Sequence, residues 1–207
     1  MTLKDQITAA AIDLFSNKGI RRVSMDDVSR KANVSKRTLY DVFDDKEALL
    51  IEVLIKMREP FNEEIILLEK MADTALDVIL QFNEKMLANP TMMMICDDFH
   101  EDIKRYPAAF DVILKSKHAA FDKIISLFRR GEQEAVFLSD INYDIISQMA
   151  QKQMSNTSPP EAFLKYSFEE VHNTMLFILL RGICTEAGRK ILEKYTIKRK
   201  MRGQKDI

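Results

Sequence analysis

The residues best suited to recognise another molecule lie together in one short stretch, residues 35–43. Its spacing predicts a very short helix that Ser35 caps, with Leu39, Val42 and Phe43 turned inward. The outward side chains are two cations, a hydroxyl and a phenol: Lys36, Arg37, Thr38 and Tyr40. Such groups on a small helix suit the major groove of DNA, where they meet phosphates and base edges.

A second helix start follows this stretch directly. Asp44 or Asp45 can cap it, and Asp44 with Glu47 has the spacing of a capping box. Lys46 then lies at the new N-terminus, where an ammonium and free backbone N–H groups together favour a phosphate.

The preceding residues contain the elements that must position this short helix. Thr2 can cap a first helix, which ends at Gly19. Ser24 and Asp27 have capping-box spacing for a second helix, and Asn33 tolerates the left-handed turn that ends it. The apolar stripe of the first helix consists of Ile7, Ala10, Ala11, Leu14 and Phe15. Three short helices with a tight turn before the third predict a helix-turn-helix.

From about Ile7 to Leu50 the sequence resembles the DNA-binding domain of the TetR family of bacterial repressors. The residues that match in register are Ala10, Ala11, Leu14, Phe15, Lys18, Gly19, Ser24–Val28, Ala32, Val34–Lys36, Thr38–Tyr40, Phe43 and Lys46–Leu50. This register over some forty residues is more specific than a helix-turn-helix pattern alone.

The resemblance implies which residues contact DNA. The family's phosphate-contacting positions are Ser24, Tyr40 and Lys46, and its base-reading positions are Lys36, Arg37, Thr38, Asp41 and Val42; Ser35 completes the expected DNA-binding set. Arg37 departs from the small residue usual in the family and can add a guanine or phosphate contact. Asp41 also departs: it either accepts from a cytosine amino group or pairs with Arg37 at i+4 spacing.

The composition agrees with a folded regulator and excludes other classes. The 207 residues are 46% hydrophobic and 30% charged, which excludes a disordered chain. The net charge is −1, but residues 18–37 hold seven cations against two carboxylates, a local charge of +5. Cys96 and Cys184 lack metal-site spacing and fit a reduced cytoplasm. The sequence has no signal-peptide core and no apolar run that could span a membrane.

The sequence beyond residue 48 predicts further helices. Few Gly and Pro residues and no long alternation favour an all-α chain, with helices expected over about 75–87, from Pro107 to near Gly131, over 142–154, 161–182 and 185–200. Pro60 is expected to interrupt or kink the fourth helix near residues 58–59. In the family that the sequence resembles, the fourth helix joins the two domains. The resemblance therefore implies a DNA-binding domain over residues 1–48 and an all-helical effector-binding and dimerisation domain over residues 49–207.

The helix from about residue 161 is apolar on all sides in its second half, so it must be covered on both sides. It resembles the helix with which the family forms homodimers; a monomer's central core helix is the alternative. The expected dimer residues are Phe163, Tyr166, Val171, Met175, Ile178, Leu179 and Gly182. A dimer would place two reading helices in successive major grooves of a palindromic operator.

The family's second domain usually holds an effector pocket, here expected for a small hydrophobic molecule. The candidate lining residues are Met92, Met93, Phe99, Phe110, Phe121, Phe128, Met149 and Phe177. Met adapts to apolar ligands, although Met and Phe at helical spacing also form ordinary core.

Other polar groups suggest weaker alternatives. Asp97, His100 and Glu101 share a helix face that a metal or plain solvent would suit, and His118 and His172 fit a core or rim. The basic C-terminal segment from Arg189 is expected to be a disordered, solvated tail. No nucleophile-and-base pair or phosphate-binding loop is present, so we expect no enzyme and no cofactor. The rival hypothesis is a helical carrier of apolar ligands that has lost specific DNA binding.

Overall fold

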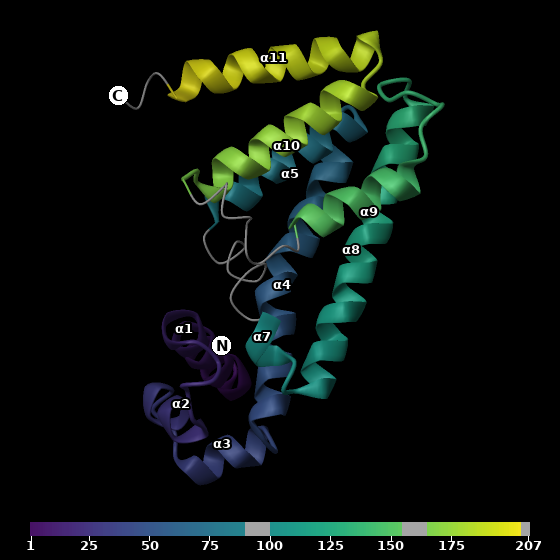
Figure 1. Cartoon of the computed structure of the whole chain (residues 1–207). Coiled ribbons are helices and arrows are strands. Elements are labelled where there is room, and N and C mark those ends of the chain that lie inside the picture. Colours follow the sequence, from purple (N-terminus) through teal and green to yellow (C-terminus); the bar gives the residue numbers. More distant parts are fainter. Residues whose placement is uncertain (90–99, 155–164, 204–207) are drawn as a thin grey trace. The chain divides into compact units, whose positions relative to one another are not determined.

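The computed structural model describes residues 1–89, 100–154 and 165–203 (Figure 1), and these residues are almost entirely helical. The helices are α1 (Leu3–Lys18), α2 (Met25–Lys31), α3 (Lys36–Val42), α4 (Lys46–Met71), α5 (Ala75–Ala88), α7 (His100–Ile103), α8 (Pro107–Gln133), α9 (Tyr143–Met154), α10 (Phe168–Ile183) and α11 (Glu186–Gly203). Within the described ranges the only β-type pairing is one isolated bridge between Phe137 and Cys184. The prediction of an all-α fold is confirmed.

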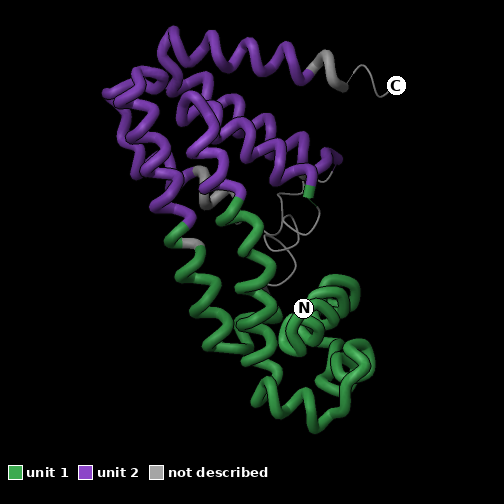
Figure 2. Tube along the Cα trace, turned by 180° about the vertical axis from the view of Figure 1, so that it is seen from behind, with its two compact units in different colours: residues 1–63, 89–119 green, residues 64–88, 120–207 purple. Residues whose placement is uncertain are grey.

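The chain forms two compact units (Figure 2). Unit 1 contains Met1–Glu63 with Asn89–Ala119, and unit 2 contains Glu64–Ala88 with Ala120–Ile207. Helices α4 and α8 each contribute residues to both units. The division after residue 48 concerns function, namely which part contacts DNA, and we retain it as a proposal.

The short helices of unit 1 begin and end where local chemistry predicts. Thr2 and Ser24 each cap a helix in a capping box, with Asp5 and Asp27 as the reciprocal partners. Gly19 follows α1 with φ +76°, and Asn33 follows α2 with φ +53°. Both residues take the left-handed region that Gly and Asn tolerate best, so each turn reverses without steric cost.

A single apolar core holds these helices. It includes all five residues of the predicted α1 stripe, together with side chains from α2, α3, α4, α7 and the start of α8: Ile7, Ala10, Ala11, Leu14, Phe15, Val28, Leu39, Leu49, Leu50, Val53, Ile103 and Ala109. Seven-residue helices such as α2 and α3 are too short to be stable alone in water. Burial in this core therefore fixes their positions.

The structure corrects two expectations about α4. The helix continues from Lys46 to Met71 with Pro60 inside it, so Pro60 does not interrupt it, while a kink near residues 58–59, the other expected outcome, stays a prediction. Met57 and Leu68, on either side of Pro60, are buried in different cores, and this packing outweighs the loss of one backbone hydrogen bond.

The start of α4 also differs from the predicted capping box. Asp45 is the cap, since its Oδ1 accepts from the Ala48 N–H at 2.8 Å. Glu47 instead accepts from the N–H groups of Ala108 and Ala109, at 2.6 and 3.3 Å, and so caps the first turn of α8. A carboxylate is well placed there because the N-terminus of a helix attracts negative charge.

Unit 2 has its own core around an aromatic cluster. Phe128 stacks on Tyr143 with ring centroids 5.2 Å apart and meets Phe137 edge-on at 5.7 Å. The Tyr143 hydroxyl donates to the Leu138 carbonyl, and burial raises the Tyr143 pKa to about 12. Cys184 is buried as expected, and burial raises the pKa of its thiol to about 11, while Cys96 lies outside the described residues.

Two expectations about the C-terminal helices need correction. Helix α10 begins at Phe168, not near residue 161, because Ser167 and Glu170 form a capping box. The basic C-terminal segment is not a disordered tail: α11 is helical to Gly203, with Leu192 buried at 3% exposure and Tyr195 packed against the core. Burial of these apolar side chains stabilises α11 as a helix, which the number of basic residues in the segment could not indicate.

Gly188 provides a test of the packing at the start of α11. A Cβ at this position would lie 2.2 Å from the Val136 carbonyl oxygen and 3.1 Å from the Cys184 Sγ. Replacing Gly by Ala in a helix normally stabilises by roughly 0.5–1 kcal/mol. We expect Gly188→Ala to do the opposite and cost about 1–3 kcal/mol, because overpacking dominates. Thermal unfolding followed by circular dichroism measures this, with Ala187→Ser at the exposed neighbouring position as control; a raised Tm for Gly188→Ala would contradict the packing described.

Candidate nucleic-acid interface

Helices α2 and α3 form the expected helix-turn-helix. The Val34 N–H donates to the Ser29 carbonyl at 3.0 Å across the turn, and Val34 is half-buried against the core of unit 1. Asn33 provides the left-handed residue between the helices. The direction of α3 is therefore fixed by the turn at its start and by its buried side chains.

The outer face of α3 presents the predicted reading residues to solvent. Leu39 is fully buried and Phe43 is 4% exposed, whereas Lys36, Arg37 and Asp41 are exposed and Tyr40 is 42% exposed. The backbone N–H of Thr38 donates to the Ser35 Oγ at 3.0 Å, and the two hydroxyl oxygens lie 2.7 Å apart. Ser35 therefore caps α3, and its hydroxyl is shared with Thr38.

Ser24 has its own hydrogen-bond partner in the protein. Its Oγ–H and its backbone N–H both donate to Asp27 Oδ2, at 2.6 and 2.9 Å. These hydrogen bonds hold the pKa of the Asp27 carboxyl below its ordinary value. The expected phosphate contact by Ser24 must therefore compete with Asp27 for the same donors.

Lys46 points inward, which corrects the expectation that its ammonium faces a phosphate. The Lys46 Nζ donates to the carbonyl oxygens of Ile20 and Val23 at 2.6 and 2.5 Å. It also lies 5.8 Å from the ring centroid of Phe15 and 5.9 Å from that of Tyr106. Burial lowers the pKa of this ammonium. Lys46 thus links the α1–α2 connection to the start of α4.

Asp41 does not pair with Arg37, the alternative that i+4 spacing favoured. Within the described part of the chain neither side chain has a hydrogen bond or an ion pair, and both are exposed. Lys36, by contrast, pairs with Asp26 of α2 at 2.8 Å, and this hydrogen bond and charge raise the Lys36 pKa. Arg37 and Asp41 therefore remain available for bases, which leaves the cytosine alternative for Asp41 as a prediction.

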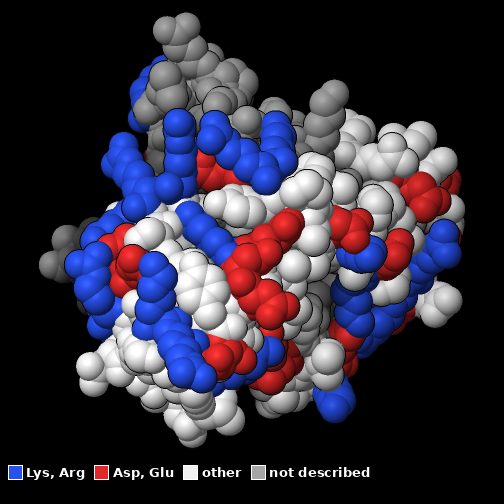
Figure 3. All heavy atoms as spheres, turned by 90° about the horizontal axis from the view of Figure 1, so that it is seen from below, with Lys and Arg blue, Asp and Glu red and all other residues white. Residues whose placement is uncertain are grey.

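The basic cluster of residues 18–37 is partly neutralised. Arg30, Lys31 and Lys36 pair with Asp27, Asp13 and Asp26, respectively. Four cations of the cluster have no ion-pair partner among the described residues: Lys18, Arg21, Arg22 and Arg37. Seen from the side of α2 and α3, basic and acidic side chains alternate over the surface (Figure 3).

Arg21 and Arg22 are exposed and belong to the basic cluster of residues 18–37, but the sequence predicted no DNA contact for them individually. They precede Ser24 directly, in the connection that Lys46 and Asp102 hold: the Arg21 N–H donates to the Asp102 carboxylate at 3.2 Å. Two free guanidiniums next to a helix-turn-helix are suitable backbone contacts for DNA. Only their local charge in the sequence indicated this.

The described members of the predicted pocket set are divided between the two units, and the pocket itself stays a prediction. Met92, Met93 and Phe99 lie outside the described residues. Phe110 packs on the core of unit 1, Phe128 and Phe177 belong to the core of unit 2, and Met149 is 59% exposed. Phe121 is half-buried. Two surface hollows in the described ranges lie along α8 and the start of α9, and none of the predicted residues lines them.

A buried polar network crosses unit 2. His172 Nε2 lies 2.8 Å from Asn83 Oδ1, and Asn83 Nδ2 donates to Asn173 Oδ1 at 3.0 Å. Both asparagines are less than 9% exposed, and burial lowers the His172 pKa. His172 therefore belongs to the interior. Asp97 and the side chains of His100 and Glu101 lie outside what the structure describes; elsewhere in the described ranges, no acidic, His or Cys cluster suits a metal.

The expected dimer residues in α10 divide between two faces. Val171, Met175, Ile178 and Gly182 follow one another at three- or four-residue intervals, so they share a face. Met175 is 38% exposed, Ile178 61% exposed, and nothing lies within 4 Å of a Cβ built on Gly182. Leu179 packs on the core, Tyr166 is 49% exposed before the helix, and Phe163 is outside the described residues.

Comparison with known proteins agrees with the helix-turn-helix geometry. Residues 7–53 match the model of the family described as bacterial regulatory proteins, tetR family. Residues 7–53 therefore form a TetR-type helix-turn-helix domain. They include most of α1, all of α2 and α3 and the start of α4, and therefore every DNA-contacting residue predicted above.

Relatives and solved structures extend this result. The biofilm operon icaADBC HTH-type negative transcriptional regulator IcaR of Staphylococcus aureus (strain Newman) is 30% identical over 80 residues, which is 39% of this chain and 43% of IcaR. IcaR of Staphylococcus epidermidis is 43% identical over 47 residues, or 23% and 25% of the two chains. The chain thus matches less than half of these relatives' length.

A likeness to a solved structure covers nearly the whole fold. A transcriptional regulator from Saccharomonospora viridis, solved in complex with choline, superposes with a TM-score of 0.72 over 88% of this chain and 98% of that one. Its sequence identity is 16%, so the likeness concerns the fold alone.

Among the described residues, no helix combines the length and the apolar character needed to cross a membrane.

Proposed function

We propose that this protein is a cytoplasmic DNA-binding transcriptional repressor that binds a palindromic operator as a homodimer and is released by a small hydrophobic effector. The observation that carries the proposal is the outer face of α3. This face is exposed on a helix-turn-helix whose inner face is buried, and its Arg37 is not engaged by any carboxylate of the described chain. Relatives named as negative regulators support the sign of the regulation.

The side chains suggest how DNA is read. The guanidinium of Arg37 can donate two hydrogen bonds to guanine O6 and N7 in the major groove. The Tyr40 hydroxyl reaches a phosphate. The backbone N–H groups at the start of α4 can also bind a phosphate, although the Lys46 ammonium itself points inward. Arg21 and Arg22 add further phosphate contacts, which set the register of the protein on the duplex.

Arg37→Ala tests the base-reading role. The duplex used is the sequence that the wild-type protein enriches from fragments of its own genome. We expect the variant to bind this duplex about 10- to 100-fold more weakly, because a bidentate contact contributes about 1–3 kcal/mol of discrimination. Fluorescence anisotropy measures the affinity.

Lys194→Ala, at an exposed lysine of α11, is the control for the loss of a positive charge. It should bind like the wild type. If the wild-type protein enriches no sequence over random duplex, DNA-reading function is refuted.

The proposed homodimer is supported by the exposed stripe on α10. Met175, Ile178 and Gly182 form an apolar face on a helix whose opposite side, through Phe177 and Leu180, is already buried in unit 2. Exposed apolar faces of this kind mark protein contacts more often than isolated apolar residues do. The open space at Gly182 allows a second helix to approach closely.

Ile178→Glu tests this face. A buried, unpaired carboxylate in the proposed dimer contact is strongly unfavourable, so we expect sedimentation to show a monomer while the helical circular dichroism signal remains. Ile145→Glu provides the matched control, because Ile145 is 55% exposed on α9 compared with 61% for Ile178. Equal sedimentation of the two variants would remove α10 from the proposed interface.

The effector proposal depends on residues 49–207 and on the continuity of the helices. Both α4 and α8 run through unit 1 and unit 2, so a change of packing in unit 2 has an unbroken helical route toward the DNA-reading helices. To release DNA, the effector needs only a higher affinity for the form that does not bind DNA than for the form that does. Among the described members of the predicted pocket set in unit 2, Phe121 is half-buried and we propose it for contact with such a ligand.

A panel of lipophilic compounds, titrated into the complex with the enriched duplex, tests the effector. We expect at least one compound to weaken DNA binding by about 5- to 150-fold, the usual range of allosteric coupling. The same compound should raise the Tm of the protein in the absence of DNA, since it binds the folded state. A panel that alters neither DNA affinity nor Tm would refute a hydrophobic effector but leave DNA binding intact.

A further inference from the structure

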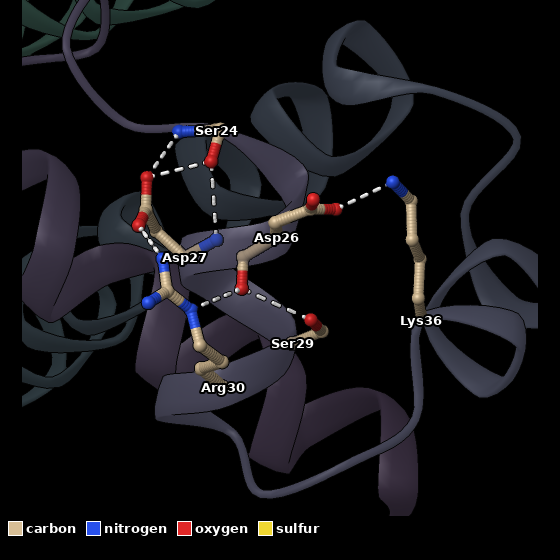
Figure 4. Close-up of polar contacts among 6 residues, drawn as sticks. All are labelled: Ser24, Asp26, Asp27, Ser29, Arg30 and Lys36. Carbon is tan, nitrogen blue, oxygen red and sulfur yellow. Dashed lines mark hydrogen bonds and ion pairs between the residues drawn. The ribbon is translucent and has the colours of Figure 1, made fainter.

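The first residue of the reading helix is held by an acid of the preceding helix. Lys36 opens α3, and its Nζ lies 2.8 Å from Asp26 Oδ1 in α2 (Figure 4). Both side chains remain largely exposed, at 61% for Lys36 and 56% for Asp26. The pair therefore lies on the protein surface, where the ammonium is open to exchange with another anion.

Adjacent acids in α2 have different partners. Asp27 is used by Ser24 in the capping box and by Arg30, whose guanidinium lies 2.5 Å away. The backbone carbonyl of Asp26 accepts from Ser29 and Arg30, but its carboxylate contacts Lys36 alone among the described residues (Figure 4). Removing the Asp26 carboxylate would thus free Lys36 without disturbing the cap of α2.

We propose that Asp26 is a specificity-determining residue, which withholds the Lys36 ammonium from DNA phosphates and so limits binding to random sequence. The proposal rests on the DNA-reading function proposed above. It also revises the role of Lys36: in the wild-type protein Lys36 neutralises Asp26 and adds little to DNA affinity. The proposed base contact of Arg37 and the proposed phosphate contact of Tyr40 are unaffected, because neither side chain has a carboxylate partner among the described residues.

The physical basis is the different origin of the two kinds of affinity. Binding to random duplex comes essentially from phosphate contacts and the release of counterions, whereas binding to an operator adds base contacts. A lysine held by a carboxylate contributes no net charge, so it removes one phosphate contact from the non-specific mode. In random sequence the protein can shift along the duplex until a freed lysine meets a phosphate, but in the operator its register is fixed. Freeing Lys36 should therefore raise random binding more than operator binding.

A double-mutant cycle in the full chain tests this assignment, using Asp26→Asn, Lys36→Met and the two combined. Binding is measured to the enriched duplex and to random duplex of equal length, over a series of salt concentrations. We expect Asp26→Asn to tighten random binding about 3- to 10-fold at 0.1 M salt and to steepen the salt dependence by about 0.9 per subunit. Lys36→Met alone should change random binding less than about 2-fold, yet in the Asp26→Asn protein it should reverse the whole gain.

Asp13→Asn is the matched control. Asp13 also pairs with a lysine of unit 1, Lys31, at 2.8 Å and with 51% and 49% exposure, so its removal changes the net charge equally. It should leave the ratio of operator to random affinity unchanged, whereas Asp26→Asn should lower that ratio. Equal Tm values for the wild type and Asp26→Asn show that the fold is retained, as the exposed position of Asp26 leads us to expect.

Three results would overturn the assignment while leaving DNA reading intact. One is a gain from Asp26→Asn that persists in the double variant, because the acid would then act by general repulsion. Another is an equal loss from Lys36→Met in both backgrounds, since Lys36 would then already contact DNA. The third is an unchanged ratio of operator to random affinity. Failure of the wild type to prefer any sequence would instead refute the proposed function, and this inference with it.

Discussion

The burial of Leu39 is the constraint on which the DNA-reading face depends. Helix α3 has only seven residues, so a few side chains on its inner face must attach it to the core. Leu39 is completely buried and Phe43 nearly so, while Ser35 caps the start. A helix this short has little stability of its own, so the core and the cap together decide its direction. Because the inner face is fixed, Arg37 and Asp41 on the outer face are positioned without a side-chain hydrogen bond or ion pair to the described part of the chain.

Electrostatics then divides the outer cations into available and engaged groups. The local charge of +5 over residues 18–37 already subtracts Asp26 and Asp27, which pair with Lys36 and Arg30, and Asp13 outside this range pairs with Lys31. Four of the seven cations are therefore left without a carboxylate partner among the described residues. The remaining ones are concentrated before Ser24 and at Arg37. A moderate, interrupted positive surface favours a protein that relies on base contacts, because uniform positive charge would strengthen random binding equally well.

The sequence predicted features that local chemistry determines and missed those that need distant partners. Ser24, Ser35 and Gly19 act within four residues of their partners, so their caps and turns were predictable. Lys46 donates to backbone carbonyls more than twenty residues earlier in the chain. Glu47 accepts from a backbone N–H about sixty residues later. Neither contact leaves a pattern in spacing. The continuity of α4 through Pro60 was missed for the same reason, since burial on both sides of it depends on residues remote in sequence.

The buried asparagine pair explains how an apolar helix can present one defined outer face. Helix α10 carries apolar residues on all sides in its second half, so hydrophobic burial alone would allow several rotations about its axis. Asn173 removes this freedom: it is 7% exposed, and its amide oxygen must meet the Asn83 amide of α5 to avoid an unpaired buried group. With Asn173 and Phe177 turned inward, the stripe through Met175 and Ile178 must face outward. A polar contact inside unit 2 thus selects which apolar surface is exposed for the proposed dimer contact.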